Sequence, residues 1–340
     1  MKINCNIPII FFHLGYADYI EIALRQAIAT NPDSEIVLFG NEASPIVDGV
    51  RRVMTRDYET PQSVKFRQNY RHMSYQQEIL ERLCFERWLW IAEFFRREGL
   101  AKAFVMDTDV MIYADLSKLS RMFAPSVKCG LAQTGDDTSD NTIGYKPVSG
   151  HSSYWTAQAI FELETLLLEL YVKPELLNLP ETRWAKYSQT HIYGGITDMD
   201  AIGLFKRGLR ADEFINTNEL PGCGGVFDLS LCLSDGAVEN QYQMRGLIKR
   251  LEWRDGLPYG IECKSGSTFR FYTLHCQGCY KSFMAGFYRG PDFAGRRRLT
   301  AENNCRKYKF ILERMVKSLA KSCLAKIAPE LLQRLRRKGV

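Results

Sequence analysis

This sequence has no uninterrupted apolar run of about 18 residues, which excludes a conventional transmembrane helix. It has no small-residue cleavage site after the short apolar stretch 7–12, so we interpret that stretch as a buried strand and not as a signal peptide. Regular cysteine spacing is absent too, because Cys276-Gln-Gly-Cys279 has no second pair at a zinc-binding distance. Together these absences favour a cytoplasmic protein with free thiols.

Internal repeats and low-complexity blocks are also absent, which excludes a repeat protein. The chain has 340 residues, of which 46% are hydrophobic and 25% charged, enough for one large domain with an ample core. Its charge is unevenly placed: residues 296–340 carry 14 Lys and Arg against 3 Asp and Glu, which leaves residues 1–295 at about −5. We therefore predict a domain at 1–295 and a basic extension at 296–340.

The basic extension has the pattern of an amphipathic helix. Between Met315 and Ile327 apolar residues recur at helical spacing with lysines opposite, and the theme returns after Pro329. This pattern suits peripheral docking on the anionic inner face of a membrane, or packing on the domain with a solvated basic face. Nucleic-acid binding is not expected, because the basic run has no reading motif and the body is acidic.

The body alternates between strand and helix patterns. An apolar run, a helical period and a second apolar run stopped by Gly40 predict a parallel sheet with a right-handed crossover. We expect an α/β domain with a mixed, mostly parallel sheet, and irregular loops with short strands at 128–150 and 221–268. The segments expected to be regular are strands at 7–12, 35–40 and 103–113 and helices at 19–29, 75–97 (closed by Gly99) and 154–171.

Two carboxylates interrupt the apolar run 103–113. A strand buried on both faces normally has continuous apolar residues, so Asp107 and Asp109 need a chemical reason. Residues i and i+2 of a strand point to one side, so both could converge on Mg²⁺ or Mn²⁺ beside nucleotide phosphates. The alternatives are a solvated strand end or a haloacid-dehalogenase type of phosphatase, although that motif requires Thr or Val where Met111 stands.

Further polar residues lie where ligands of α/β sheets bind. His13 and Asn41 follow predicted strands, as the two aspartates do, and such carboxyl ends line one crevice. Downstream, His275 could complete a metal site, and Gly278 would let the backbone approach a pyrophosphate. Lys281 could neutralise a leaving diphosphate.

The spacing Asp107-x-Asp109 followed by His275-x-x-Gly278-x-x-Lys281 resembles GT-A glycosyltransferases, most closely the glycogenin- and galactosyltransferase-like family 8. The resemblance implies a Rossmann-like GT-A domain in which Asp107, Asp109 and His275 bind Mn²⁺ or Mg²⁺. Gly278 and Lys281 would contact the diphosphate of a UDP-sugar, with His13 and Asp107 also on the donor. Transfer to a hydroxyl of a glycan, lipid or protein, with retention, would follow. The proline that the family has after this lysine is Ser282 here.

A third motif, Gly194-Gly-Ile-Thr-Asp198-Met-Asp200, is similar to the Asp-Gln segment that such enzymes place beside sugar and acceptor, with Met199 replacing the glutamine. Asp198 could orient sugar hydroxyls or receive the acceptor proton, so we name it with Lys281 as a catalytic candidate. Alternatively Thr197 or Asp198 is simply a helix N-cap. Gln189 and His191 are further candidates on the acceptor side.

Arginines and tryptophans of the predicted helix 75–97 have a plainer interpretation. Arg82 and Arg87 could reach phosphate, but we favour pairing with glutamates on a solvated face, and we expect Trp88 and Trp90 to be core residues. Two other classes of function remain open. One is a different Mg²⁺-dependent phosphate or nucleotide enzyme, such as a nucleotidyltransferase or phosphatase, and the other is a non-catalytic glycan-binding protein of the same fold.

Overall fold

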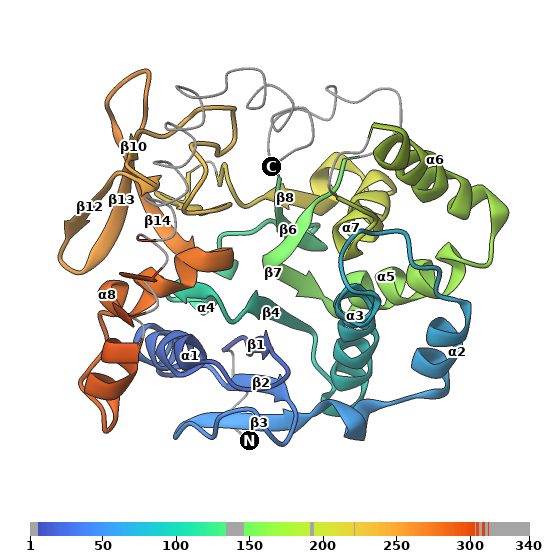
Figure 1. The fold of residues 1–340 in the computed structure, drawn as a ribbon, viewed down its shortest axis with the longest axis horizontal. Coiled ribbons are helices and arrows are strands. Elements are labelled where there is room, and N and C mark those ends of the chain that lie inside the picture. The colour runs from blue at the N-terminus through green and yellow to red at the C-terminus, as the bar shows by residue number, and fades with distance from the viewer. Residues whose placement is uncertain are drawn as a thin grey trace, which may run out of the picture.

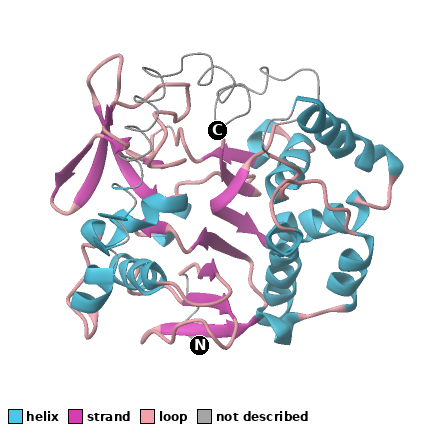
Figure 2. Cartoon of the chain, viewed as in Figure 1, coloured by secondary structure: helices cyan, strands magenta, loops and turns pink. Residues whose placement is uncertain are grey.

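The computed structural model describes residues 6–133, 146–190, 194–220 and 222–302, with a few further residues up to 312. Helices cover both faces of a central sheet, and a smaller sheet lies beside it (Figures 1 and 2). The prediction of an α/β fold is confirmed.

The central sheet has seven strands. β3, β2, β1 and β4 are mutually parallel, β7 is antiparallel to both of its neighbours, and β6 is parallel to β8. The mixed, mostly parallel sheet predicted from the sequence is therefore confirmed. In spatial order the strands are β3 (Val50–Met54), β2 (Ile36–Gly40), β1 (Ile9–Phe12), β4 (Lys102–Asp107), β7 (Ser149–Thr156), β6 (Cys129–Ala132) and β8 (Phe214–Asn216).

The strands of this sheet are apolar because both of their faces are buried. Ile9 and Phe11 of β1 belong to the core on the α1 side, whereas Ile10 belongs to the core on the α3 side. Phe104 and Val105 of β4 divide in the same way. Continuous apolar sequence is the expected result of this two-sided burial.

The second sheet lies against the end of β4. β5 pairs antiparallel with β14, so that Val110 lies opposite His275 and two distant segments meet. The region 221–268 was expected to be loops with short strands, and it contains several. The strands are β12 (Leu251–Arg254), β13 (Leu257–Ile261), β14 (Thr268–His275), β5 (Val110–Ile112), β9 (Val226–Phe227) beside β14, and the hairpin β10 (Met244–Arg245) and β11 (Ile248–Lys249).

Helix ends follow local sequence signals. α3 ends at Gly99, which adopts the left-handed conformation (φ 62°) and whose N–H bonds to the carbonyls of the last turn. The helices are α1 (Asp18–Thr30), α2 (Pro61–Asn69), α3 (Glu78–Glu98), α4 (Leu116–Ser120), α5 (Ala157–Leu170), α6 (Pro174–Thr190), α7 (Asp198–Arg207) and α8 (Met284–Phe287), with 3₁₀ turns at Thr55–Tyr58, Ala211–Glu213 and Gly278–Phe283.

Two predicted elements were wrong in extent. The segment 103–113 is not one strand: β4 ends at Asp107, the chain turns at Thr108 and Asp109, and β5 continues in the other sheet. The first three residues of the predicted helix 154–171 belong to β7, and α5 starts only after Thr156, whose hydroxyl accepts the Ala159 N–H. In both cases pairing with distant strands overrides the local pattern.

The basic extension begins packed on the domain. Residues 296–302 are helical, and Leu299 lies in the core with 1% of its surface exposed. Residues 313–340, which include the amphipathic segments, lie outside the described residues, so their membrane contact and the boundary at 295 stay predictions. Among the described helices, none combines the length and apolar content needed to cross a membrane.

Candidate functional site

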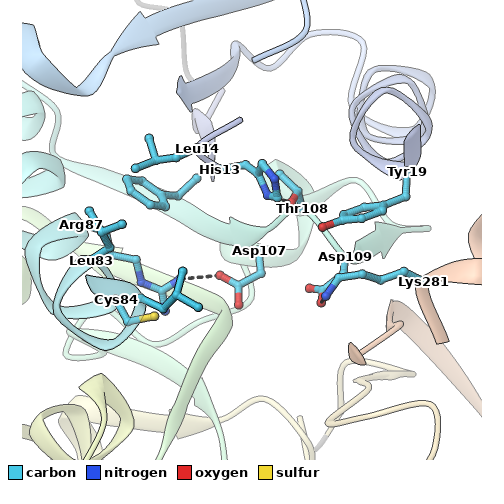
Figure 3. Close-up of a pocket in the computed structure, with 12 residues that line it drawn as sticks. His13, Leu14, Tyr19, Leu83, Cys84, Arg87, Asp107, Thr108, Asp109 and Lys281 are labelled. Carbon is cyan, nitrogen blue, oxygen red and sulfur yellow. Dashed lines mark hydrogen bonds and ion pairs between the residues drawn. The ribbon is translucent and has the colours of Figure 1, made fainter. Parts of the chain in front are cut away.

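A cleft of about 290 Å³ lies at the carboxyl ends of β1 and β4 (Figure 3). The parallel register of these strands sets Phe12 beside Asp107, and so His13 beside Thr108, whose side chains lie 2.9 Å apart. The predicted crevice is therefore present. It is lined by Phe12, His13, Leu14, Tyr19, Leu80, Leu83, Cys84, Arg87, Asp107, Thr108, Asp109 and Lys281.

Asp109 is the most enclosed carboxylate of the cleft, with 7% of its surface exposed. Its Oδ2 lies 3.0 Å from Lys281 Nζ, and its Oδ1 lies 3.5 Å from His275 Nε2. Oδ1 is buried and accepts no hydrogen bond within the described structure. Burial opposes ionisation of Asp109, but the adjacent His275 and Lys281 outweigh it and hold the pKa of Asp109 below its usual range.

Asp107 faces a different partner. Its Oδ1 lies 2.5 Å from Arg87 Nη1, and Arg87 Nη2 lies 2.7 Å from Asp198 Oδ2. Figure 3 shows the Asp107 carboxylate turned toward Arg87 and the Asp109 carboxylate turned toward Lys281. The expectation that both aspartates project from one side of a strand was wrong in geometry, because a turn separates them.

Arg87 was misjudged from the sequence. We expected it on a solvated face with neighbouring glutamates, but only 10% of its side chain is exposed and it bridges two aspartates. Arg82, in contrast, does lie near glutamates, as expected. Helical periodicity could have indicated the position of Arg87. Arg87 lies three residues after Cys84 and seven after Leu80, so the three side chains share one helix face, and all three line the cleft.

Asp198 is the first residue of α7, and the structure confirms only the second of its two sequence interpretations, the helix start. Thr197 is the N-cap and Asp200 completes a capping box, so the helix start is as predicted. The Asp198 carboxylate is buried and accepts hydrogen bonds from Arg87 and from Trp88 Nε1, the latter at 3.0 Å. It does not line the cleft and reaches it through Arg87.

Buried residues hold His275 in place through its ring and through its backbone. Its Nδ1 lies 2.7 Å from the Leu229 carbonyl, which can only accept, so Nδ1 carries the proton and Nε2 faces Asp109. The ring of His151 stacks on it at 3.9 Å. The His275 backbone N–H donates to Asp228, whose carboxylate pairs with the fully buried Lys249. Sequence reasoning did not assign any of these four supporting residues, Leu229, His151, Asp228 and Lys249, to the site, because none belongs to a recognised motif.

Asp109 and His275 are of the residue types that bind Mn²⁺ or Mg²⁺. Asp109 Oδ1 and His275 Nε2 lie 3.5 Å apart, so these two atoms could both contribute to one cation site. A mixed imidazole and carboxylate set suits Mn²⁺. Among the described residues, however, no three such groups already stand together as a metal centre, since Asp107 faces Arg87.

The segment after β14 brings in Lys281. Gly278 has φ 60° and nothing within 4 Å of the position of a Cβ atom, a conformation that favours glycine. Gly278 itself does not line the cleft. From the same 3₁₀ turn, Lys281 reaches Asp109; burial opposes its charge, but Asp109 outweighs burial and raises the pKa of Lys281.

A second, wider hollow of about 640 Å³ adjoins the cleft through His13, Tyr19 and Lys281. Burial and then Lys281 lower the pKa of His13, so the imidazole is neutral near pH 7. The exposed ring of Tyr16 and the carboxylate of Glu302, from the start of the basic extension, also line this hollow.

Of the other candidates, Asn41 and Gln189 do not line the cleft. The Asn41 side chain accepts the Gly15 N–H and holds the loop after β1. Gln189 is exposed on the last turn of α6, and His191 lies outside the described residues. Trp88 and Trp90 are buried, as expected.

Glu81 of α3 yields a prediction about stability and pH. Burial first, and then Asp198 and Asp200, raise the pKa of Glu81 from 4.5 to about 7. Between these values the folded protein holds the proton more tightly than the unfolded chain, so stability is full below pH 4.5 and is lost as pH rises through 7. The glutamine of Glu81→Gln cannot ionise. We therefore expect the free energy of unfolding of this variant to exceed that of wild type by about 3 kcal/mol at pH 8.

Urea unfolding at pH 4.5 and pH 8 measures this difference between Glu81→Gln and wild type. The gain should disappear at pH 4.5, where both side chains are neutral. Glu78→Gln, an exposed change in the same helical turn, is the control and should show no such pH dependence. An equal gain at both pH values would contradict the raised pKa.

No protein-family model and no curated protein matches this chain in sequence. Similar solved structures include mouse xyloside xylosyltransferase 1 (11% identity; 62% of this chain and 84% of that chain; TM-score 0.40). Another is the bifunctional glycosyltransferase WbbM (11% identity; 87% of this chain and 51% of that chain; TM-score 0.46). A third is the galactosyltransferase LgtC with donor and acceptor sugar analogues (15% identity; 63% of this chain and 74% of that chain; TM-score 0.31). This chain thus spans about half the length of WbbM.

Proposed function

We propose that this protein is a glycosyltransferase that moves a sugar from a nucleoside-diphosphate donor, with UDP as the expected nucleotide, to a hydroxyl acceptor. One observation carries the proposal: the buried carboxylate of Asp109 lies beside the His275 imidazole and the Lys281 ammonium group, and Asp109 and Lys281 line a cleft at the carboxyl ends of parallel strands. Ligands of α/β sheets bind at such an edge. Carboxylate and imidazole suit a divalent cation, and ammonium suits a diphosphate.

In this proposal, Asp107, Asp109 and His275 hold Mn²⁺ or Mg²⁺ beside the donor. When bound, such a cation would supply positive charge that stabilises the leaving diphosphate. Asp109 and His275 already face each other, and the Leu229 carbonyl fixes the imidazole tautomer with Nε2 toward Asp109. Asp107 lines the same cleft and would exchange part of its contact with Arg87 for the cation.

The remaining side chains position the donor. Lys281 would neutralise the leaving diphosphate, and Gly278 would allow its turn to approach. The neutral His13 and the exposed ring of Tyr16 border the wider hollow, which has room for the nucleoside. Arg87 presents a guanidinium to the cleft for sugar hydroxyls or phosphate, and Asp198 acts through Arg87 as a positioning residue. A glycan, lipid or protein acceptor and a retaining outcome remain part of the proposal.

Isothermal titration of UDP and of GDP, each with Mn²⁺ and with EDTA, tests this function. We expect UDP to bind only with the cation, because the diphosphate and the carboxylates need it to neutralise their mutual repulsion. Cation-dependent binding of GDP in place of UDP would keep the enzyme class and change the donor. Absence of any cation-dependent nucleotide binding would overturn the proposal and favour a phosphatase or a structural role for Asp107 and Asp109.

A further inference from the structure

Lys281 pairs with Asp109 in the structure, which is unexpected for a group that would serve a donor diphosphate. The Nζ–Oδ2 distance is 3.0 Å, and 24% of the lysine side chain is exposed against 10% of the aspartate. The lysine therefore occupies the oxygen of Asp109 that does not face His275. A divalent cation and this ammonium group compete for the same carboxylate.

Charge balance in the cleft sharpens this competition. Asp109 is paired with Lys281, and Asp107 shares Arg87 with Asp198, so each carboxylate of the motif already has a cationic partner. A divalent cation that binds alone would place positive charge beside the Lys281 ammonium group, and no added negative charge would offset the repulsion. A diphosphate that arrives with the cation supplies the missing negative charge and gives the ammonium a new partner.

Lys281 has the flexibility and the surroundings to move from Asp109 to a diphosphate. Its ammonium ends a flexible four-carbon stem on a short 3₁₀ turn. The ammonium also lies 5.4 Å from the centre of the Tyr19 ring, a neutral face that would support it as it moves. His13, the neighbouring imidazole of the cleft, has a lowered pKa because of burial and Lys281, so it does not replace the lysine as a cation.

We infer that Lys281 is a specificity-determining residue that makes the cleft select a cation–diphosphate pair over a free cation. It is the resting counter-ion of Asp109, and it transfers to the diphosphate when the cation takes its place. Cation and nucleotide then tighten each other's binding by the same factor, as linkage requires. This inference rests on the proposed function and adds to it the coupling between the two ligands.

Substitution of Lys281 by methionine gives a result that separates this role from simple phosphate binding. Lys281→Met should bind Mn²⁺ alone at least about tenfold more tightly than wild type, because a like charge beside the ligand is removed. The same variant should bind UDP with Mn²⁺ more weakly. The factor by which UDP tightens Mn²⁺ should consequently collapse. Electron paramagnetic resonance of free Mn²⁺ measures the first affinity, and calorimetry measures the second.

Two further variants control the experiment. Lys281→Arg keeps the charge and should retain weak binding of Mn²⁺ alone. Lys118→Met changes an exposed lysine that pairs with Asp115 outside the cleft and should match wild type throughout. Thermal unfolding of each variant checks that the fold is intact.

The possible failures are distinguishable. If wild type binds UDP with Mn²⁺ but Lys281→Met binds Mn²⁺ alone no more tightly, or keeps the coupling factor, the exchange role of Lys281 is overturned while the proposed function stands. If wild type binds no UDP with Mn²⁺, both the proposed function and the coupling are overturned. Weak Mn²⁺ binding by Lys281→Arg together with tight binding by Lys281→Met supports the inference.

Discussion

Asp109→Asn is expected to abolish cation-dependent UDP binding, with a loss of at least about 100-fold in affinity. Even the residues that support a metal ligand are typically worth 10–100-fold, and Asp109 would be a ligand itself. Asparagine keeps the shape of the side chain but removes the charge that draws the cation and that pairs with Lys281. Transfer of sugar from any donor that the wild type accepts should fall by at least the same factor. Calorimetry with Mn²⁺ and UDP measures the binding.

Asp57→Asn is a suitable control for this change, because Asp57 is an exposed aspartate that does not line the cleft. It should bind UDP as wild type does. A second check is thermal unfolding, which must show that Asp109→Asn is folded at the temperature of the titration. Unchanged UDP binding by a folded Asp109→Asn protein would move the cation site away from this cleft.

Arg87→Met is expected to destabilise the protein by about 3–5 kcal/mol, the usual cost of leaving a buried charge without its partner. Arg87 joins Asp107 to Asp198, and only 7% of the Asp198 side chain is exposed. Without the guanidinium, Asp198 would keep one hydrogen bond, from Trp88. Urea unfolding at pH 7 measures the loss.

A double variant shows whether the loss comes from the stranded charge. Arg87→Met/Asp198→Asn removes both members of the pair, and we expect it to recover most of the stability lost by Arg87→Met alone. Arg97→Met, on the same helix with 45% of the side chain exposed, is the control and should cost no more than about 1 kcal/mol. A double variant as unstable as Arg87→Met would show that the pair with Asp198 does not dominate.

Local sequence patterns predicted many elements of the fold. Helical periodicity marked α1 and the body of α3, and Gly99 marked the end of α3, because capping depends on residues within one turn. Apolar runs marked β1 and β2 because both faces of these strands are buried. The division of 103–113 into two strands was not predictable in this way, since it depends on pairing with β14, far along the chain.

In the candidate site, too, some features were predictable from local sequence and others depended on tertiary contacts. By itself, the sequence determined an alternating α/β domain and singled out His13, Asp107, Asp109, His275 and Lys281, because unusual polar residues at strand ends are visible locally. Only the tertiary structure decided their partners: Asp107 with Arg87, Asp109 with Lys281, and His275 above His151. A charged residue on a helix has the same sequence pattern whether it faces water or a buried carboxylate. Its partner is decided by how elements distant in the chain pack together.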